Sequence, residues 1–267
     1  MSPAARSVLA LALGCGAALM VLGVLRSQTA HSPRWVRTNF RGRSVHLAAG
    51  PALVVGSCAG AVVGAVGTRP TLGIVGAALI AGTAGLIDDL AGDAGVKGLR
   101  GHLGAMRRGR LTSGAVKIPL LCLAGLVAGV VVHGFGLRAL LDAAFVAGAA
   151  NLVNLLDLRP ARAAKVLLVG AAACLAVGAT AAAAPAGATL AVLPSDLRER
   201  VMIGDAGANG AGAAVAATAL AAIRLPTLLV GLGIVIVLTL ISERVSFSRV
   251  IERVAVLRWL DLLGRQQ

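Results

Sequence analysis

Apolar residues form long runs along this 267-residue chain, and short polar segments separate the runs. A helix needs about 20 apolar residues, with a range near 17–25, to cross a bilayer. The runs that fit are roughly 8–25, 46–68, 70–87, 117–134, 138–156, 207–222 and 226–242. A further stretch, 164–195, is too long for one upright helix and short for two, and "AAAAPAGA" (181–188) offers a place for a hairpin turn. The pattern predicts an all-α, polytopic membrane helix bundle.

The basic residues favour two helices in 164–195, because cytoplasmic loops are enriched in Lys and Arg. Two helices there give about nine transmembrane helices, an N-terminus outside, and inside segments 26–45, 88–117, 157–165, 196–206 and 243–267. These segments hold 5, 6, 3, 2 and 5 of the 25 Lys and Arg residues, 21 in all, whereas a single helix would divide them 15 to 10. We therefore expect a multi-pass protein of the cell (inner or plasma) membrane whose active face is cytoplasmic.

The composition agrees with a bilayer environment. Charged residues make up 13% of the chain, against about 25% in soluble domains. The net charge of +14 does not indicate nucleic acid, since the basic residues lie in short clusters between apolar runs and aromatic residues, at 2%, are too few to stack bases. Anionic lipids and phosphorylated substrates fit the charge better. The four cysteines lie inside apolar runs without metal-ligand spacing, so we interpret them as small buried hydrophobes.

The last residues have a different pattern from the rest. Apolar residues recur at three- and four-residue spacing from Val250 to Leu260, with charged residues between them. This is typical of an amphipathic helix on a membrane surface, with Trp259 at the headgroup level. The expected organisation is a transmembrane domain over 1–243 and a cytoplasmic amphipathic tail over 244–267.

Three polar clusters lie at the inner ends of predicted spans. They are Asp88 and Asp89 with Asp93 in "GLIDDLAGD", Asn151, Asn154 and Asp157 in "NLVNLLD", and Asp205 in "GDAGAN". Mg²⁺ takes hard oxygen ligands, usually one or two carboxylates together with substrate phosphates. In a helix the two asparagines and Asp157 share one face, and the glycines around Asp205 let a backbone approach a phosphate. Each cluster also has a simpler explanation: a solvated helix end, hydrogen bonding between helices, and an N-cap with close glycine packing.

The order and spacing of these motifs resemble the polyprenyl-phosphate N-acetylhexosamine-1-phosphate transferase superfamily, which is glycosyltransferase family 4. "GLIDDLAGD" is similar to the family's Asp-Asp motif, "NLVNLLD" to its Asn-x-x-Asn-x-x-Asp motif and "GDAGA" to its Gly-Asp-x-Gly motif. "NFRGRSVHLAAG" (39–50) is similar to the first cytoplasmic loop of the family. The resemblance covers about residues 35–250.

The resemblance implies an enzyme, a phosphotransferase that moves a sugar-1-phosphate from a UDP-sugar to a polyprenyl phosphate and releases UMP, as in cell-wall biogenesis. It implies catalytic roles for Asp88, Asp89 and Asp205, with Asp89 and Asp205 as ligands of Mg²⁺. It also implies that Asn151, Asn154 and Asp157 help to hold the nucleotide sugar. A homodimer is left open.

Basic residues after the first acids are candidates for clamping the diphosphate. They are Lys97, Arg100, His102, Arg107 and Arg108, with Lys117 at the start of the next span. The alternative explanation of these residues is membrane topology and lipid contact.

Two departures from the family pattern keep other functions open. The last loop reads "SERVSFSRVIER", without the usual histidines, and "DLRPARAAK" stands where "DGLDG" is expected. Arg159, Arg162 and Arg244 are candidates to replace the lost contacts to the donor. A catalytically degenerate member that acts as a membrane partner or scaffold in envelope assembly is the alternative. A small transporter is a third class, but it predicts acids near mid-membrane, where only Asp142 comes close.

Overall fold

The structure, a computed structural model, describes residues 1–91 and 113–265, and this part of the chain is all-α apart from one small hairpin. The helices are α1 (Pro3–Gln28), α2 (Ala49–Gly64), α3 (Thr68–Ala91), α5 (Ser113–His133), α6 (Leu137–Leu156), α7 (Arg162–Ala176), α8 (Ala183–Leu197), α9 (Gly204–Leu220), α10 (Leu225–Ser242), α11 (Phe247–Arg253) and α12 (Ala255–Leu262). Two short 3₁₀ helices, η1 (Pro33–Trp35) and η2 (Thr180–Ala182), and two antiparallel strands, β1 (Val36–Thr38) and β2 (Ser44–His46), complete it.

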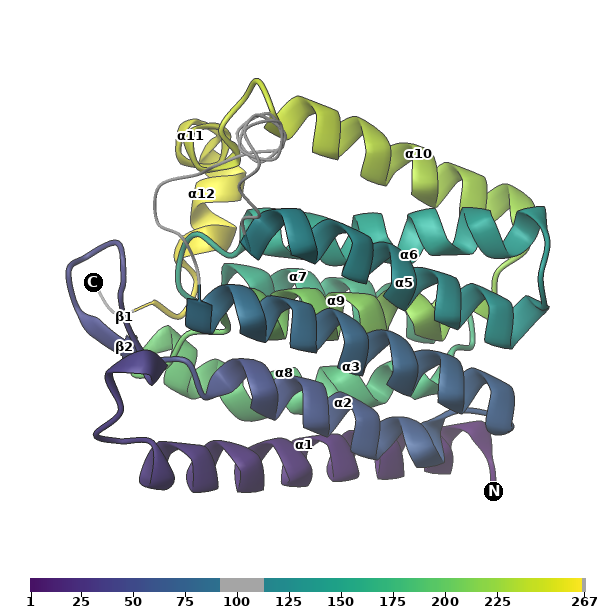
Figure 1. Cartoon of the computed structure of the whole chain (residues 1–267), viewed down its shortest axis with the longest axis horizontal. Coiled ribbons are helices and arrows are strands. Elements are labelled where there is room, and N and C mark those ends of the chain that lie inside the picture. Colours follow the sequence, from purple (N-terminus) through teal and green to yellow (C-terminus); the bar gives the residue numbers. More distant parts are fainter. Residues whose placement is uncertain (92–112, 266–267) are drawn as a thin grey trace.

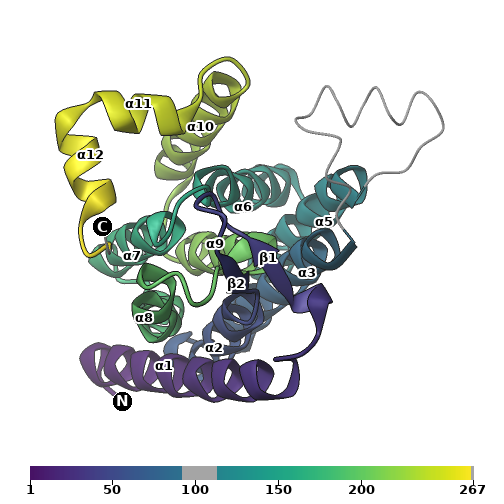
Figure 2. The same cartoon turned by 90° about the vertical axis from the view of Figure 1, so that its left-hand side faces the viewer.

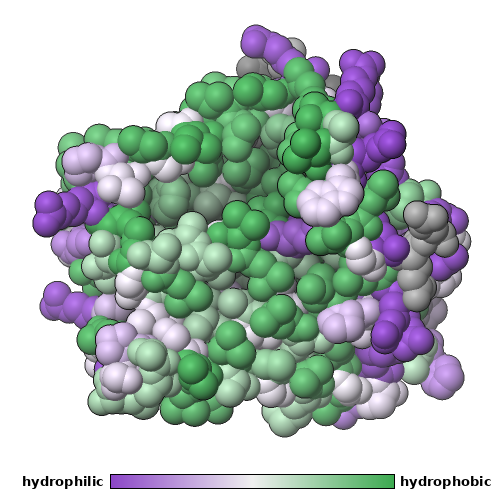
Figure 3. All heavy atoms as spheres, turned by 180° about the vertical axis from the view of Figure 1, so that it is seen from behind, coloured by the Kyte–Doolittle hydropathy of each residue, from purple (hydrophilic) through white to green (hydrophobic). Residues whose placement is uncertain are grey.

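Helices α1 to α3 and α5 to α10 lie side by side with their axes roughly parallel or antiparallel (Figure 1). Among the described residues, five helices are long and apolar enough to cross a membrane: α1, α3, α5, α6 and α10. Figure 3 shows hydrophobic residues over most of one face, with hydrophilic residues gathered mainly at its right-hand edge. The sequence prediction of an all-α membrane bundle is confirmed at this level.

The prediction of nine spans is not settled by helix length. Each predicted run contains a helix, but α2, α7, α8 and α9 have 16, 15, 15 and 17 residues. The stretch 164–195 does form two helices. Its turn lies at 177–182, however, and not in 181–188, since Pro185 and Gly187 belong to the first turns of α8. Proline is tolerated there because the first N–H groups of a helix have no partner within it.

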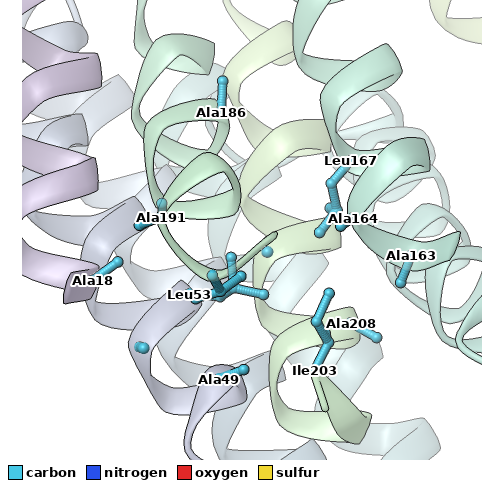
Figure 4. Close-up of a cluster of buried hydrophobic side chains, with 14 of the residues drawn as sticks. Ala18, Ala49, Leu53, Ala163, Ala164, Leu167, Ala186, Ala191, Ile203 and Ala208 are labelled. Carbon is cyan, nitrogen blue, oxygen red and sulfur yellow. The ribbon is translucent and has the colours of Figure 1, made fainter. Parts of the chain in front are cut away.

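Helix α9 is the centre of the bundle, and α2, α3, α6 and α7 pack around it. Every residue of α9 except Asp205 is buried, and most of them are Ala or Gly. Small residues allow membrane helices to approach closely. Figure 4 shows one of the resulting clusters, in which Leu53 of α2 and Leu167 of α7 lie near Ile203 and Ala208 of the α9 region. The other main cluster joins α3, α5, α6, α9 and α10.

One end of the bundle carries β1 and β2, and we call it the hairpin end (Figures 1 and 2). The strands pair with Val36 opposite His46, and His46 also forms a parallel bridge to Val201 just before α9. The described parts of the segments predicted to share one side of the membrane all lie at this end (Figure 1); they are 26–45, 88–91, 113–117, 157–165, 196–206 and 243–265. The tail differs from the single amphipathic helix expected, because the chain turns at Val254 (φ −88°, ψ 113°) and forms the two helices α11 and α12.

Candidate functional site

The carboxylate of Asp89 lies against the first turn of α9. Its Oδ1 accepts a hydrogen bond from the backbone N–H of Asp205 at 3.0 Å, and its Oδ2 accepts one from that of Ala206 at 2.9 Å. The N-cap residue, Ile203, has no side-chain acceptor of its own, so Asp89 supplies the cap from another helix. A negative charge there is also favoured by the helix dipole.

Two glycines make this contact between α3 and α9 possible. Gly204 has a φ of +62°, and a Cβ at this position would lie 2.9 Å from Asp89 Oδ2. A Cβ at Gly85 would lie 2.1 Å from the backbone oxygen of Asp205. The glycines of "GLIDD" and "GDAG" therefore set the distance between the two acidic motifs.

Lys117 of α5 lies between the carboxylates of the two motifs. Its side chain is 9% exposed, its Nζ pairs with Asp205 Oδ2, and the same Nζ is 3.6 Å from Asp88 Oδ2. The Asp88 and Asp205 side chains are 22% and 30% exposed, so the group opens toward solvent on the acidic side. In the sequence analysis Lys117 was one of several basic candidates for contacting the diphosphate.

Asn154 of α6 joins the same group. With its amide oriented to satisfy both neighbours, Nδ2 donates to Asp205 Oδ1 at 2.8 Å and Oδ1 accepts from Lys117 Nζ at 2.8 Å. Asn151, one turn earlier on α6, makes no side-chain hydrogen bond to the described residues. Side chains from α3, α5, α6 and α9 thus meet at the hairpin end, and we call Asp88, Asp89, Lys117, Asn154 and Asp205 the carboxylate–lysine cluster.

Asp157 follows α6 and lines a separate cavity of about 190 Å³ beside the hairpin, which we call the hairpin pocket. Its lining includes Asn39, Phe40, Asp157, Arg159, Asp196 and Glu199. Burial raises the pKa of Asp157 well above its usual range, and the charges of Asp196, Asp205 and Asp89 raise it further. The influence of Asp205 and Asp89 on Asp157 places the pocket close to the carboxylate–lysine cluster. Its lining combines the cationic side chain of Arg159 with the acidic groups of Asp157, Asp196 and Glu199.

The residues that shape the hairpin pocket were largely missed in the sequence. Glu199, at a φ of +54°, accepts a hydrogen bond from Asn39 Nδ2 at 2.6 Å and pairs with Arg41 at 3.0 Å. The Arg159 guanidinium lies over the Phe40 ring, 4.1 Å from its centroid. Arg37 of β1 donates to the backbone oxygen of Asp89. The sequence analysis named Arg159 as a candidate contact to the donor, and the likeness of "NFRGR" to a family loop was the signal for Asn39, Phe40 and Arg41.

Several predicted site residues cannot be compared with the structure. Asp93, Lys97, Arg100, His102, Arg107 and Arg108 lie outside the described residues. Among residues 1–91 and 113–265, no group of three or more His, Cys, Asp or Glu side chains is placed to hold a metal ion. In the carboxylate–lysine cluster, Lys117 lies among the acids.

Two other sequence hypotheses are changed by the structure. Arg162 is not available as a donor contact, because its guanidinium makes paired hydrogen bonds of 2.8 and 3.1 Å to Asp261 of α12. Asp142, the one acid that favoured a transporter, is fully buried and is held by His133 at 2.6 Å and Arg138 at 2.9 Å. A carboxylate with both of these partners has a structural role in joining α5 and α6.

No known protein-family model matches this chain, and no curated protein matches it significantly. The resemblance to the sugar-phosphate transferases consequently depends on the motifs themselves and on where their side chains lie.

Proposed function

We propose that this protein transfers a sugar-1-phosphate from a UDP-sugar to a polyprenyl phosphate at the cytoplasmic face of the cell membrane. The observation that carries the proposal is the carboxylate–lysine cluster, in which residues from "GLIDD", "NLVNLLD" and "GDAG" meet at the end of four different helices. Such a convergence is expected when separate motifs handle one substrate.

In the proposed reaction a phosphate oxygen of the lipid attacks the β-phosphorus of the UDP-sugar. A new bond forms between this oxygen and the β-phosphorus. The bond between the β-phosphorus and the oxygen that bridges it to the α-phosphorus breaks, and UMP leaves with the bridging oxygen. Both substrates are polyanions, so the site must offset their repulsion and align the attacking and leaving oxygens. Lys117 is placed to contact a phosphate, since its Nζ already lies between two anionic groups.

The donor set of the cluster fits a magnesium ion. Asp205 and Asp88 present partly exposed carboxylates around the position that the Lys117 ammonium now takes, and one or two carboxylates plus substrate phosphates are the usual Mg²⁺ environment. We assign the ligands to these two residues rather than to Asp89, because the partners of Asp205 are the side chains of Lys117 and Asn154, whereas both oxygens of Asp89 accept backbone N–H groups of α9. When bound, the metal would neutralise phosphate charge. Asp89 keeps the end of α9 and its Asp205 in place.

The hairpin pocket is the proposed location of the donor headgroup. It adjoins the cluster through Asp157, its Phe40–Arg159 wall offers a flat cationic surface, and Asn39 and Glu199 offer polar groups. A nucleotide sugar has a planar base, hydroxyl groups and a diphosphate, which match a stacking surface, polar groups and a cation respectively.

The test is UMP release from purified protein given labelled UDP-sugars, polyprenyl phosphate and Mg²⁺. We expect Asp88→Asn, Asp205→Asn and Lys117→Met each to lower the rate by about 10²-fold or more, the scale of losing a group that stabilises transition-state charge. Glu243→Gln, an exposed acid at the end of α10, is the matched control and should keep the full rate. Full activity in Asp205→Asn, or no UMP from any donor while a known transferase is active, would refute the proposal.

A non-catalytic scaffold is the second candidate, and one observation favours it. The Lys117 ammonium already neutralises the carboxylates that a metal would need, and Arg162 is engaged with the tail. Binding of Mn²⁺, followed by its electron paramagnetic resonance signal, separates the two functions without requiring turnover. A transferase should bind Mn²⁺ and lose it in Asp88→Asn and Asp205→Asn, whereas a scaffold should bind none.

A further inference from the structure

The tail helices α11 and α12 are fastened to the bundle through their polar side. Asp261 is 9% exposed, and its carboxylate accepts hydrogen bonds from Arg162 and, at 2.7 Å, from Arg265. Lys165 Nζ donates to the backbone oxygens of Leu260 and Asp261, both at 2.8 Å, and Arg162 also donates to Ser248 of α11 at 2.9 Å. This network connects both tail helices to the first turn of α7.

Because the polar side faces inward, the apolar side of the tail faces outward. Val256 is 66% exposed, Trp259 62% and Leu263 52%. Figure 2 shows α11 leading outward from the end of α10 at the hairpin end, and α12 returning from it toward α7. The tail follows directly from α10, a strongly apolar helix with few buried residues, so its apolar side continues a surface that already suits lipid.

Basic residues accompany this apolar side. Arg244, Arg249, Arg253 and Arg258 lie along the tail, and none of them forms an ion pair with another described residue. Unpaired arginines next to exposed aliphatic side chains and a tryptophan are the pattern of a helix that lies in the interface of an anionic membrane. A protein partner would be expected to supply carboxylates to these arginines, but an anionic leaflet supplies phosphates along the whole length of the tail.

We propose that α11 and α12 form a strap that binds anionic phospholipid headgroups at the hairpin end and transmits this contact to the hairpin pocket. The link has two parts. Glu252 of α11 accepts a hydrogen bond from Arg159, the residue that covers Phe40, at 3.2 Å. Arg265, beyond α12, donates to the backbone oxygen of Pro160 at 2.9 Å. Both Arg159 and Pro160 line the pocket, so the position of the strap determines the position of one pocket wall.

The lipid contact is independent of the proposed transferase function. An effect of the strap on donor use rests on that function. The experiment therefore measures the lipid contact without substrate. Full-length protein carrying Trp35→Phe, which leaves Trp259 as the sole tryptophan, is reconstituted into phosphatidylcholine vesicles. Either brominated phosphatidylcholine or brominated phosphatidylglycerol is then added as a quencher of Trp259 fluorescence.

We expect brominated phosphatidylglycerol to quench Trp259 at a severalfold lower content than brominated phosphatidylcholine. Arg253→Gln and Arg258→Gln should each reduce this preference by about fivefold. Arg6→Gln is the control and should leave the preference unchanged, because Arg6 lies near the start of α1, at the end of the bundle opposite the hairpin end. Equal quenching by the two lipids, or no quenching by either, would overturn the proposal. Protection from quenching that increases with protein content would also overturn it, because a second copy of the chain would then cover the strap.

Asp261→Asn tests the link to the pocket, and Glu252→Gln tests it with less risk to folding. In both variants we expect UMP release to show a raised KM for the donor and a nearly unchanged kcat, since the wall is displaced but the carboxylate–lysine cluster is intact. Normal donor KM in both variants would overturn the link. Quenching of Trp259 by lipid in a protein that releases no UMP would support the strap while refuting the transferase.

Discussion

Lys117 lies between carboxylates that are distant from each other in the sequence. Its residue type alone therefore could not identify it as a member of the carboxylate–lysine cluster. Asp88 and Asp205 are separated by more than a hundred residues, and only the packing of α3, α5 and α9 brings them to one ammonium group. The acids themselves could be found in the sequence, because each belongs to a short motif at the inner end of a predicted span.

Gly85 gives a residue-scale prediction that tests the contact between α3 and α9. A Cβ at Gly85 would lie 2.1 Å from the backbone oxygen of Asp205, and a backbone atom cannot rotate away. We expect Gly85→Ala to lower the free energy of unfolding by about 1–3 kcal/mol, the scale of overpacking, and to lower the proposed transferase activity as Asp205 moves.

Gly16 of α1 is the matched control for this substitution. A Cβ there would meet nothing within 4 Å, so Gly16→Ala should keep or raise stability by up to about 1 kcal/mol through helix propensity. The measurement is thermal or denaturant unfolding of both variants in the same detergent. Equal stability changes in the two variants would mean that α3 and α9 are not in close contact.

At the scale of elements, the hairpin is held by His46. Its Nε2 lies 2.9 Å from Thr29 Oγ1, its Nδ1 accepts the backbone N–H of Ala48 at 3.0 Å, and its ring stacks on Trp35. An acceptor at Nδ1 requires the neutral ring. Burial lowers the pKa of His46 below its usual value near 6.5, and the charge of Arg26 acts in the same direction. The neutral form is therefore the one that folding favours.

The sign of the resulting pH dependence follows from this lowered pKa. The contribution of His46 to hairpin stability is complete above its unfolded pKa, near 6.5, and is lost as the pH falls through the lower folded pKa. We expect the fluorescence of Trp35, measured in a Trp259→Phe background, to change as the pH falls below the unfolded pKa of the ring and through its lower folded pKa. His46→Asn should abolish this change and His31→Asn should preserve it, and an unaltered titration in His46→Asn would contradict the assignment.

The strap shows how element packing alters the interpretation of a periodic pattern. The spacing of apolar residues in the tail correctly indicated helix with an apolar side, but it did not reveal that Asp261 is drawn inward by Arg162. Burial alone would raise the pKa of Asp261, but the hydrogen bond and charge of Arg162, together with the charge of Arg265, outweigh it and hold the pKa below its ordinary value. The strap should therefore stay docked at neutral pH.

At the scale of the whole molecule, the predicted inside segments gather at the hairpin end, and their side of the membrane can be tested directly. In a cysteine-free background, Ser44→Cys places a thiol on exposed β2, and Phe135→Cys places one in the loop between α5 and α6, where Phe135 is 91% exposed. We expect a membrane-impermeant maleimide to label Phe135→Cys in intact cells, and Ser44→Cys only after the membrane is opened.

The two labelled positions serve as controls for each other, since each is exposed and lies at a different end of the bundle. Labelling of both from outside would contradict the prediction that the segments at the hairpin end lie on the cytoplasmic side. These segments are 26–45, 88–91, 113–117, 157–165, 196–206 and 243–265. Labelling of Ser44→Cys alone from outside would invert the topology and separate the carboxylate–lysine cluster from a cytoplasmic UDP-sugar.

The sequence by itself determined the all-helical membrane class, the approximate position along the chain of each helix of the bundle, and the acids at the ends of predicted spans. These properties depend on local hydrophobicity and charge, which each segment carries wherever it packs. Only the tertiary structure decided that Lys117 lies among those acids, that Asp89 caps α9 and that Arg162 holds the tail. Such contacts join residues far apart in the chain, so they depend on which helices are neighbours and on the close approach that glycines such as Gly85 permit.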